Sequence, residues 1–394
     1  MREVVIVDAV RSAVGKRGGG LSNTHANVLL GGVLSGLLQR NGLSGAEVGH
    51  VLGGCVTQLG MQAANVTRNA WLTAGLPIEV AAATVNAQCG SSQEAHRLAH
   101  AQIAGGLADV AVACGVEGMS RVPIGSNMPP GGPHGQPRGN EYAEVHEPTT
   151  QFEGADRIAE KWGLSRSALD AFAKSSQDRA ARAWEEDRFA GQIVPIQASV
   201  TDDAGEIVGT RTIERDEGMR PTTLEGLAKL RPNQPDRVPE SYHTAGSSSQ
   251  ISDGASAVLL AGREKADELG LRPRARIVDS VLVGSDPVLM LTGPIPATAA
   301  LFSRTGLSLS DIDVVEINEA FASVVCAWAQ EFDADMEKVN VNGGAIALGH
   351  PLGATGTLLI TKALHELERG GGRYGLITMC CGGGLGTGTI IERL

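Results

Sequence analysis

Short apolar runs, separated by longer stretches of helical periodicity, divide the chain from end to end. The runs lie at 4–10, 109–114, 275–283, 313–317 and 375–379. Because successive positions within each run are apolar, both faces of the corresponding strand are expected to be buried. Strands of this kind between helices indicate an α/β fold with a sheet covered on both sides, and they disfavour a large antiparallel sandwich.

Two parts of the chain repeat the same order of features. The run at 4–10 (VVIVDAV) recurs at 275–281 as ARIVDSV. A Gly/Ser turn at Cys89 is followed by a helix and an apolar strand, and so is a Gly-rich turn at His350. Two copies of one α/β unit would explain this order, although short strand repeats also arise by chance.

Different material lies between the two copies. Residues 123–148 are rich in proline and glycine and cannot hold regular structure for long. A turn at 202–205 is expected between two short extended segments. We therefore interpret 120–249 as an inserted region that covers the face of the duplicated body. Helical spacing within it predicts one amphipathic helix, with its buried face formed by Leu169, Phe172, Ala173, Ser176, Ala180, Ala183 and Trp184.

The composition is that of a globular protein with two or three compact units. Of the 394 residues, 42% are apolar and 20% charged, so most of the chain can bury enough apolar surface to fold. The 52 glycines are nearly twice the usual share and imply tight turns and close backbone packing. The net charge of -11 argues against a nucleic-acid partner, because phosphate binding needs a concentrated basic stripe.

No stretch approaches the roughly 20 apolar residues that span a bilayer, and the chain runs into the apolar segment at 4–7 without the features of a signal sequence. We therefore expect a soluble, cytoplasmic protein with no membrane partner. The six cysteines show neither a C-x-x-C pair nor zinc spacing, and they are too few for a disulfide framework. An important cysteine is therefore expected to be a reactive thiol, and no metal site is expected.

Cys89 lies in the segment Q-C-G-S-S-Q-E, where Ser91 and Glu94 have the spacing of a capping box. The next helix is therefore expected to begin within two residues of the thiol. Free N–H groups and the positive end of the helix dipole favour a thiolate, so a pKa near 7 or below is expected. A buried structural cysteine is the alternative, and it is the more common fate of this residue type.

His350 lies in the Gly-rich segment N-G-G-A-I-A-L-G-H-P-L-G-A-T-G. Pro351 restricts the backbone after the histidine, and the glycines allow close approach of backbone to a ligand. An imidazole held in this way suits a general base, whereas chance placement of one of nine histidines is the alternative.

Cys380 and Cys381 follow an apolar run and precede three glycines, so a thiol is expected at a strand end, facing exposed backbone N–H groups. A dinucleotide-binding turn is disfavoured because the pattern is not G-x-G-x-x-G. We favour a second catalytic thiol, and a plain tight turn remains the alternative.

Asn318 lies between an apolar strand and an apolar helix, where it could either act in a site or cap the helix. His96 and His100 are four residues apart, but the sequence between them lacks the metalloprotease pattern, so we expect a solvated helix face. No G-x-S-x-G motif occurs, which argues against a serine-hydrolase elbow.

Four of these segments together resemble the signature segments of the thiolase family, and the resemblance covers nearly the whole chain. The segments are Cys89 at a helix start, Asn318-Glu319-Ala320-Phe321, Gly349-His350-Pro351, and Cys380 followed by Gly382, Gly383 and Gly384. The resemblance implies a thiolase fold, in which two βαβαβαββ halves stack into five αβαβα layers with an inserted loop domain. The N-terminal half would then comprise 1–119 and 250–272, the loop domain 120–249, and the C-terminal half 273–394.

The resemblance also implies roles for individual residues. Cys89 would be the nucleophile that takes the acyl group, His350 would activate it, and Cys380 would transfer the proton of the second substrate. Two oxyanion holes are implied, one formed by His350 and a water held by Asn318, the other by the backbone N–H groups of Cys89 and Gly382. Such an enzyme binds no permanent cofactor and uses coenzyme A as a substrate.

Three further positions match residues of the family that contact the substrate. Ser249 would contact pantetheine, Arg220 the nucleotide end of coenzyme A, and Met290 would line the acyl pocket. The partners implied are acyl-CoA and CoA, and the assembly implied is a homodimer or a homotetramer.

The substrate is the least determined property. The segment at Gln151-Phe152 departs from the His-Met pair typical of acetoacetyl-specific members, and several segments look more like the actinobacterial branch that degrades bulky and steroid acyl-CoAs. We therefore expect degradative cleavage of 3-ketoacyl-CoA, with acetyl-CoA C-acetyltransferase activity second. A decarboxylating ketosynthase would need a second histidine in place of Cys380, and a noncatalytic acyl-CoA-binding or lipid-binding relative would be expected to lose an active side chain.

Overall fold

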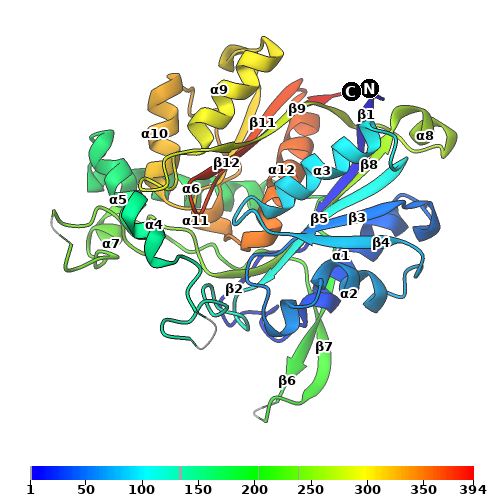
Figure 1. The fold of residues 1–394 in the computed structure, drawn as a ribbon, viewed down its shortest axis with the longest axis horizontal. Helices are drawn as coiled ribbons and strands as arrows, with labels where there is room; N and C mark the ends of the chain where they lie inside the picture. The colour runs from blue at the N-terminus through cyan, green and yellow to red at the C-terminus, as the bar shows by residue number, and fades with distance from the viewer. Residues whose placement is uncertain (1, 133–134, 203, 238) are drawn as a thin grey trace.

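The computed structural model describes residues 2–132, 135–202, 204–237 and 239–394, and it arranges strands and helices in alternating layers (Figure 1). Ten strands share one hydrogen-bonded sheet in the order β10-β11-β12-β9-β1-β8-β5-β3-β4, with β2 paired to β8. The strands are β1 (Val4–Arg11), β2 (Gly15–Lys16), β3 (His50–Gly54), β4 (Ala81–Val85), β5 (Val110–Gly118), β8 (Ser252–Gly262), β9 (Ala275–Gly284), β10 (Val314–Ile317), β11 (Tyr374–Cys381) and β12 (Leu385–Arg393).

The sheet consists of two halves with the same strand pattern. In the N-terminal half β8 lies antiparallel to β1 and β5, and β3 lies parallel to β5. In the C-terminal half β12 lies antiparallel to β9 and β11, and β10 lies parallel to β11. The halves meet where β1 pairs with β9, through Val5 with Arg276 and Ile6 with Ala275. The duplication predicted from the sequence is therefore confirmed.

Helices cover both faces of each half. One apolar cluster packs α1 and α2 on the N-terminal half, and another packs α9 and α10 on the C-terminal half. A third joins α3 and α12 to strands of both halves, through side chains such as Ala99, Leu364, Ile6 and Ile377. The result is the expected five-layer order. The helices are α1 (Ala26–Arg40), α2 (Val66–Thr73), α3 (Ser91–Ala104), α8 (Arg263–Glu268), α9 (Pro294–Thr305), α10 (Ala322–Phe332), α11 (Ala345–Leu348) and α12 (Thr355–Gly370), with single turns η1 (Gly45–Glu47), η2 (Gly60–Gln62), η3 (Leu309–Asp311) and η4 (Leu352–Ala354).

The five apolar runs all form strands of this sheet. Every residue of β1, β5 and β10 is buried, as expected for strands between two helical layers. Strand β9 is covered less completely, because Arg276, Leu282 and Gly284 are exposed. The prediction that both faces of each strand are buried is therefore confirmed for four of the runs and only in part for 275–283.

The strands β5 and β8 are neighbours, although more than a hundred residues separate them in sequence. The intervening chain carries the predicted amphipathic helix as α6, and the described residues of the segment 123–148 form regular structure only in α4. The predicted turn joins β6 to β7, with Asp203 outside the described residues, as Pro133 is. The elements are α4 (Asn140–Val145), α5 (Gln151–Lys161), α6 (Arg166–Glu185), β6 (Ile196–Thr201), β7 (Ile207–Ile213) and α7 (Leu224–Ala228).

A buried ion pair connects the chain between β5 and β8 to the sheet. Arg11, at the end of β1, donates two hydrogen bonds to Asp216 at 2.7 and 2.9 Å, and both side chains are fully buried. The same carboxylate accepts the backbone N–H of Val14. Because removing one partner would leave an uncompensated buried charge, this contact holds the segment around Asp216 in one position. Within the described residues, no helix is long and apolar enough to cross a membrane.

Candidate active site

Cys89 lies in the tight turn immediately before α3. The helix begins at Ser91 with Gly90 as its N-cap, so the predicted start is confirmed. The predicted capping box is wrong: the Ser91 hydroxyl accepts the backbone N–H of Ala87, four residues earlier, and Glu94 pairs with Arg97 at 2.6 Å. The Ser91 side chain therefore stabilises the turn that holds Cys89, and the N–H groups of Gly90 and Ser91 donate to carbonyls within the same turn.

The thiol of Cys89 is protonated in the unliganded protein. Burial raises its pKa to about 11, hydrogen bonds from the backbone N–H groups of Gly382 and Cys89 lower it, and the carboxylate of Glu117 raises it. The expectation of a pKa near 7 is therefore wrong. The donors are present as predicted, but removal of the sulfur from water disfavours the thiolate more than they favour it.

The loop before α12 presents His350. Gly349 has φ of 113°, and a Cβ on it would lie 2.2 Å from the Ser252 hydroxyl, so this position requires glycine. The backbone N–H of His350 donates to that hydroxyl at 3.1 Å. The histidine is thus held between Ser252 and Pro351, as its sequence context indicated.

Hydrogen bonds determine which nitrogen of His350 is free. Nδ1 lies 2.6 Å from the Thr355 hydroxyl, and that hydroxyl donates its own proton to the Pro351 carbonyl at 2.9 Å. Thr355 must therefore accept from Nδ1–H, which leaves a lone pair on Nε2. Burial lowers the pKa of His350 to about 4. The side chain is neutral at pH 7 and can accept a proton at Nε2.

Asn318 follows β10 and lies beside this lone pair, with its Nδ2 3.3 Å from His350 Nε2. Asn318 does not cap a helix, because α10 begins four residues later with Phe321 as its N-cap. Its Oδ1 is buried and has no hydrogen-bond partner among the described residues. Of the two interpretations of Asn318, helix capping is wrong, and the side chain instead contacts His350.

The glycines after β11 bring Cys380, Cys381 and Gly382 against the Cys89 turn. A Cβ on Gly90 would lie 2.6 Å from Cys381 Sγ. Burial raises the pKa of the Cys380 thiol well above its usual value, and the nearby Cys89 raises it further. Two segments distant in sequence therefore meet around the two thiols.

The three predicted substrate contacts lie along segments that adjoin the site. Ser249 donates its backbone N–H to the Ala320 carbonyl at 2.9 Å. The exposed Arg220 reaches the Ala245 carbonyl at 3.3 Å. Met290 is buried in one apolar cluster with Phe321 and Cys380.

Three polar residues support the site and were not identified from the sequence. Thr355 orients His350, as described above. Glu117, at the end of β5, accepts backbone N–H groups of Val56, Thr57 and Gly353, so it joins the two halves of the fold. Glu319 accepts from Ser176, Asn340 and the backbone of Ile346. The partners of Glu117 and Glu319 lie far away in sequence, so no local pattern could have indicated them, whereas Thr355 lies only five residues after His350.

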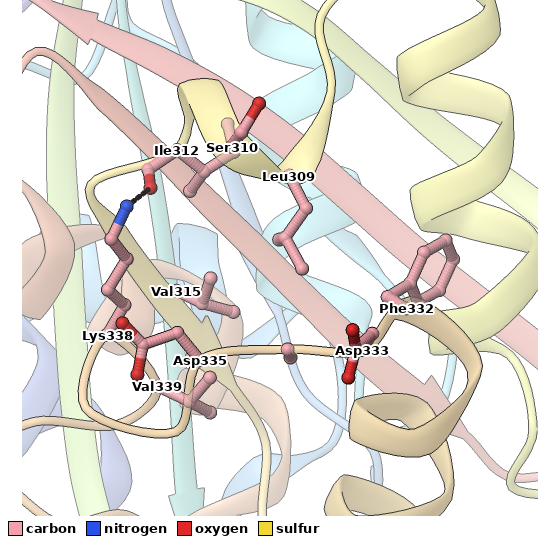
Figure 2. Close-up of a pocket in the computed structure, with 10 residues that line it drawn as sticks. Leu309, Ser310, Ile312, Val315, Phe332, Asp333, Asp335, Lys338 and Val339 are labelled. Atoms are coloured by element: carbon pink, nitrogen blue, oxygen red, sulfur yellow. Dashed lines mark hydrogen bonds between the residues drawn. The ribbon is translucent and has the colours of Figure 1, made fainter.

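Neither of two cavities is lined by Cys89, Asn318, His350 or Cys380. One of about 370 Å³ lies beside Arg220 and is lined in part by Arg215, Met219 and Pro221. Figure 2 shows another, of about 320 Å³, lined by apolar side chains such as Val315 and Phe332 and closed on one side by Lys338, which donates to the Ile312 carbonyl. This second cavity contains none of the predicted site residues.

The histidine pair of α3 differs from its prediction. His96 is fully buried, and neither ring nitrogen has a hydrogen-bond partner among the described residues. Burial lowers the pKa of His96 to about 3 and also lowers that of His100. The expected solvated face is wrong because α3 is the central layer, covered by both halves of the sheet. In the part of the chain that the structure describes, no group of three or more His, Cys, Asp or Glu side chains is arranged to hold a metal ion.

Comparisons with known proteins agree with this geometry. Residues 4–264 match the N-terminal domain of the thiolase family, and residues 271–393 match its C-terminal domain. A steroid 3-ketoacyl-CoA thiolase, FadA6, of Mycobacterium tuberculosis is 48% identical over 100% of this chain and 95% of that protein. A beta-ketoadipyl-CoA thiolase of Pseudomonas aeruginosa is 42% identical over 100% of both chains.

A solved structure shares the whole fold. The crystal structure of the Bacillus anthracis acetyl-CoA acetyltransferase superposes with a TM-score of 0.89 at 38% identity, covering 100% of this chain and 99% of that one. The match of both domain families and of full-length relatives leads to one conclusion: this chain belongs to the thiolase family, and it is an acyltransferase.

Proposed function

We propose that the protein cleaves 3-ketoacyl-CoA with CoA, through an acyl-Cys89 intermediate, to give acetyl-CoA or another short acyl-CoA and a shortened acyl-CoA. The observation that carries this proposal is the arrangement at Cys89. Backbone N–H groups of Cys89 and Gly382 face its sulfur, and a neutral His350, whose Nε2 lies 3.3 Å from Asn318 Nδ2, lies in the loop before α12. A thiol, a proton acceptor and two backbone donors are what an acyl-transfer site requires.

In the first half-reaction Cys89 Sγ attacks the 3-keto carbon, and its proton passes to His350 Nε2. The N–H groups of Cys89 and Gly382 stabilise the negative charge on the keto oxygen. When the C2–C3 bond breaks, the enolate of acetyl-CoA leaves and takes a proton from Cys380. Because Nε2 now carries a proton, His350 can donate to the enolate oxygen, beside a water held by Asn318.

In the second half-reaction CoA enters and loses its thiol proton to the thiolate of Cys380. Its sulfur then attacks the thioester on Cys89, and the shortened acyl-CoA leaves as Cys89 recovers a proton from His350. The energy of the thioester bond is kept throughout, which a serine ester would not achieve. Burial raises the pKa of both the Cys89 and the Cys380 thiol. Each thiol therefore gives up its proton as the new bond forms rather than beforehand.

Coenzyme A is proposed to extend from this centre along the segment of Ser249 towards Arg220. The exposed guanidinium of Arg220 and the cavity of about 370 Å³ beside it suit the phosphates and the nucleotide end. The acyl group is proposed to lie against Met290. Residues 120–249 would then act as a loop domain over the CoA site, between N-terminal residues 1–119 and 250–272 and C-terminal residues 273–394.

The acyl group is proposed to be bulky, as the name of the FadA6 relative indicates for that protein. Synthesis of acetoacetyl-CoA is the second candidate, favoured by the similarity to an acetyl-CoA acetyltransferase structure. A series of 3-ketoacyl-CoA substrates from four carbons to steroid size distinguishes the two, with cleavage followed as loss of the enolate absorbance. Cleavage of the bulky members supports the first choice, and cleavage of acetoacetyl-CoA alone supports the second.

If no chain length is cleaved, the proposed reaction is refuted. Cys89→Ser is the matched control, because it keeps the size of the side chain but should abolish turnover and labelling by iodoacetamide. A labelled Cys89 protected by acyl-CoA, without any cleavage, would favour a noncatalytic binding protein.

We further propose a homodimer or a dimer of dimers that acts in the cytoplasm. Strand β4 lies at the end of the sheet order, and Ile78 just before it is 70% exposed. An open strand edge beside an exposed apolar side chain is suited to pairing with a second copy. All six cysteines are free thiols, which suits a reducing compartment. Sedimentation of the purified chain tests the assembly, and a monomer at micromolar concentration would contradict it.

A further inference from the structure

Helix α10 follows the Asn318 segment directly and cannot cap its own N-terminus. Its N-cap residue is Phe321, whose side chain accepts no hydrogen bond. The first backbone N–H groups of a helix need partners from elsewhere, and here another segment supplies them. The N–H of Ala322 donates to the Ser247 carbonyl at 3.0 Å, and the N–H of Ser323 donates to His243 Nε2 at 3.4 Å.

The orientation of His243 is fixed from its other side. Its Nδ1 lies 2.8 Å from Asp156 Oδ1, and both side chains are almost fully buried. Because the carboxylate accepts, Nδ1 carries the proton and Nε2 keeps the lone pair that the helix requires. The backbone N–H groups of Tyr242 and His243 donate to the same oxygen at 3.0 and 3.2 Å. Asp156 on α5 therefore determines which nitrogen faces α10.

The contact by which His243 caps α10 lies between two segments of the proposed CoA site. The loop that leads to Ser249 begins one residue after His243. Ser249 donates its backbone N–H to the Ala320 carbonyl. An isolated bridge also pairs Ser248 with Phe321, whose ring lies edge-on to the imidazole at 5.4 Å. The position of the Ser249 loop relative to the Asn318 loop therefore depends on contacts that meet at His243.

We infer that His243 is a positioning residue: by capping α10 through Nε2, with Nδ1 held by Asp156, it sets the spacing between the Ser249 loop and the Asn318 loop. This inference rests on the proposed function, because that spacing matters only if pantetheine lies between the two loops. His243 contacts Asp156, Ser323 and Phe321 rather than Cys89 or His350, so it is assigned no role in proton transfer.

Three substitutions separate the two bonds of the imidazole. In His243→Asn the amide nitrogen takes the place of Nδ1, so the bond to Asp156 is kept and the cap is lost. In His243→Gln the amide oxygen can reach the place of Nε2, so the cap is kept. His243→Leu loses both. We expect KM for CoA to rise about 5- to 20-fold in the Asn and Leu variants, with a smaller fall in kcat, and to rise less than 2-fold in the Gln variant.

His365→Leu is the matched control. His365 is a half-buried histidine on α12 that also bonds to the backbone, at the Ala9 carbonyl, and no hydrogen bond of its side chain reaches the Ser249 loop among the described residues. This variant should lose thermal stability and keep its KM for CoA. The rate at which iodoacetamide labels Cys89 should remain unchanged in every His243 variant, since the Cys89 turn makes no contact with the cap.

An unchanged KM in His243→Leu would overturn the inference, and so would equal losses in the Gln and Leu variants. If the Leu variant does not fold, the comparison of Asn with Gln decides the question alone. A wild-type protein that neither cleaves 3-ketoacyl-CoA nor binds CoA would instead refute the proposed function. If the wild type is active and the KM for CoA is unchanged in the His243 variants, only the role of His243 is refuted.

Discussion

Replacing Thr355 with valine tests how the base is held, because valine keeps the shape of threonine and removes only the hydroxyl. That hydroxyl accepts from His350 Nδ1 at 2.6 Å and donates to the Pro351 carbonyl at 2.9 Å. His350 and Thr355 are 3% and 1% exposed, so water cannot take its place. The variant leaves one buried donor and one buried acceptor without a partner.

The two losses should appear in different measurements. The carbonyl is unpaired at every stage, which costs about 1 to 2 kcal/mol of folding free energy. The Nδ1 bond becomes charge-assisted when His350 takes the proton of Cys89, so its loss costs about 1.5 to 3 kcal/mol in the transition state. With about 1.4 kcal/mol for each factor of ten, kcat should fall about 10- to 150-fold.

Single-turnover acylation of Cys89 by 3-ketoacyl-CoA, followed by rapid mixing, measures this step directly. Thr357→Val is the control, because the Thr357 hydroxyl is equally buried and pairs with Ser256 at 2.6 Å without touching His350. It should lose stability and keep its acylation rate. If Thr355→Val acylates within 2-fold of the wild type, the tautomer of His350 is not held as inferred here.

Three further outcomes follow from burial. Labelling of Cys89 by iodoacetamide should rise about tenfold per pH unit from pH 7 to 10, since its pKa is about 11, and a plateau by pH 8 would contradict this. Burial lowers the pKa of His96 to about 3 and those of His350 and His365 to about 4, so the unfolded chain binds protons first as pH falls below 6.5. Urea unfolding should therefore show a loss of up to about 1.4 kcal/mol per pH unit for each histidine between pH 6 and 4, with a smaller slope in His96→Leu. Glu117→Leu leaves three backbone N–H groups unpaired and should cost about 3 kcal/mol or more in the same assay, and a neutral effect would show that the buried carboxylate is dispensable.

Local pattern was a good guide to the elements and to where they end. The apolar runs became strands, the helix began directly after Cys89, and Asn318, His350 and Cys380 came from the ends of segments that strand and helix periodicity had already delimited. These inferences succeeded because neighbours in sequence determine where a strand stops and which side chains follow it.

The electrostatic and capping inferences failed for different reasons. The pKa of Cys89 and the solvation of His96 depend on burial by distant segments, whereas the Ser91 hydroxyl accepts the N–H of Ala87 within its own turn. Both halves of the sheet bury α3, and the turn before it uses the Ser91 hydroxyl for itself. Residue propensity and spacing cannot predict such burial, because it arises only when layers distant in sequence pack together.

The sequence by itself determined the α/β layering, the internal duplication and the types of residue available for acyl transfer, since periodicity and residue chemistry are local properties. Only the tertiary structure decided the protonation of Cys89, the contact of Asn318 with His350 Nε2 and the capping of α10 by His243. Each of these depends on a hydrogen bond or a loss of solvent between segments far apart in the chain, and such contacts exist only once the two halves and the intervening region have packed together.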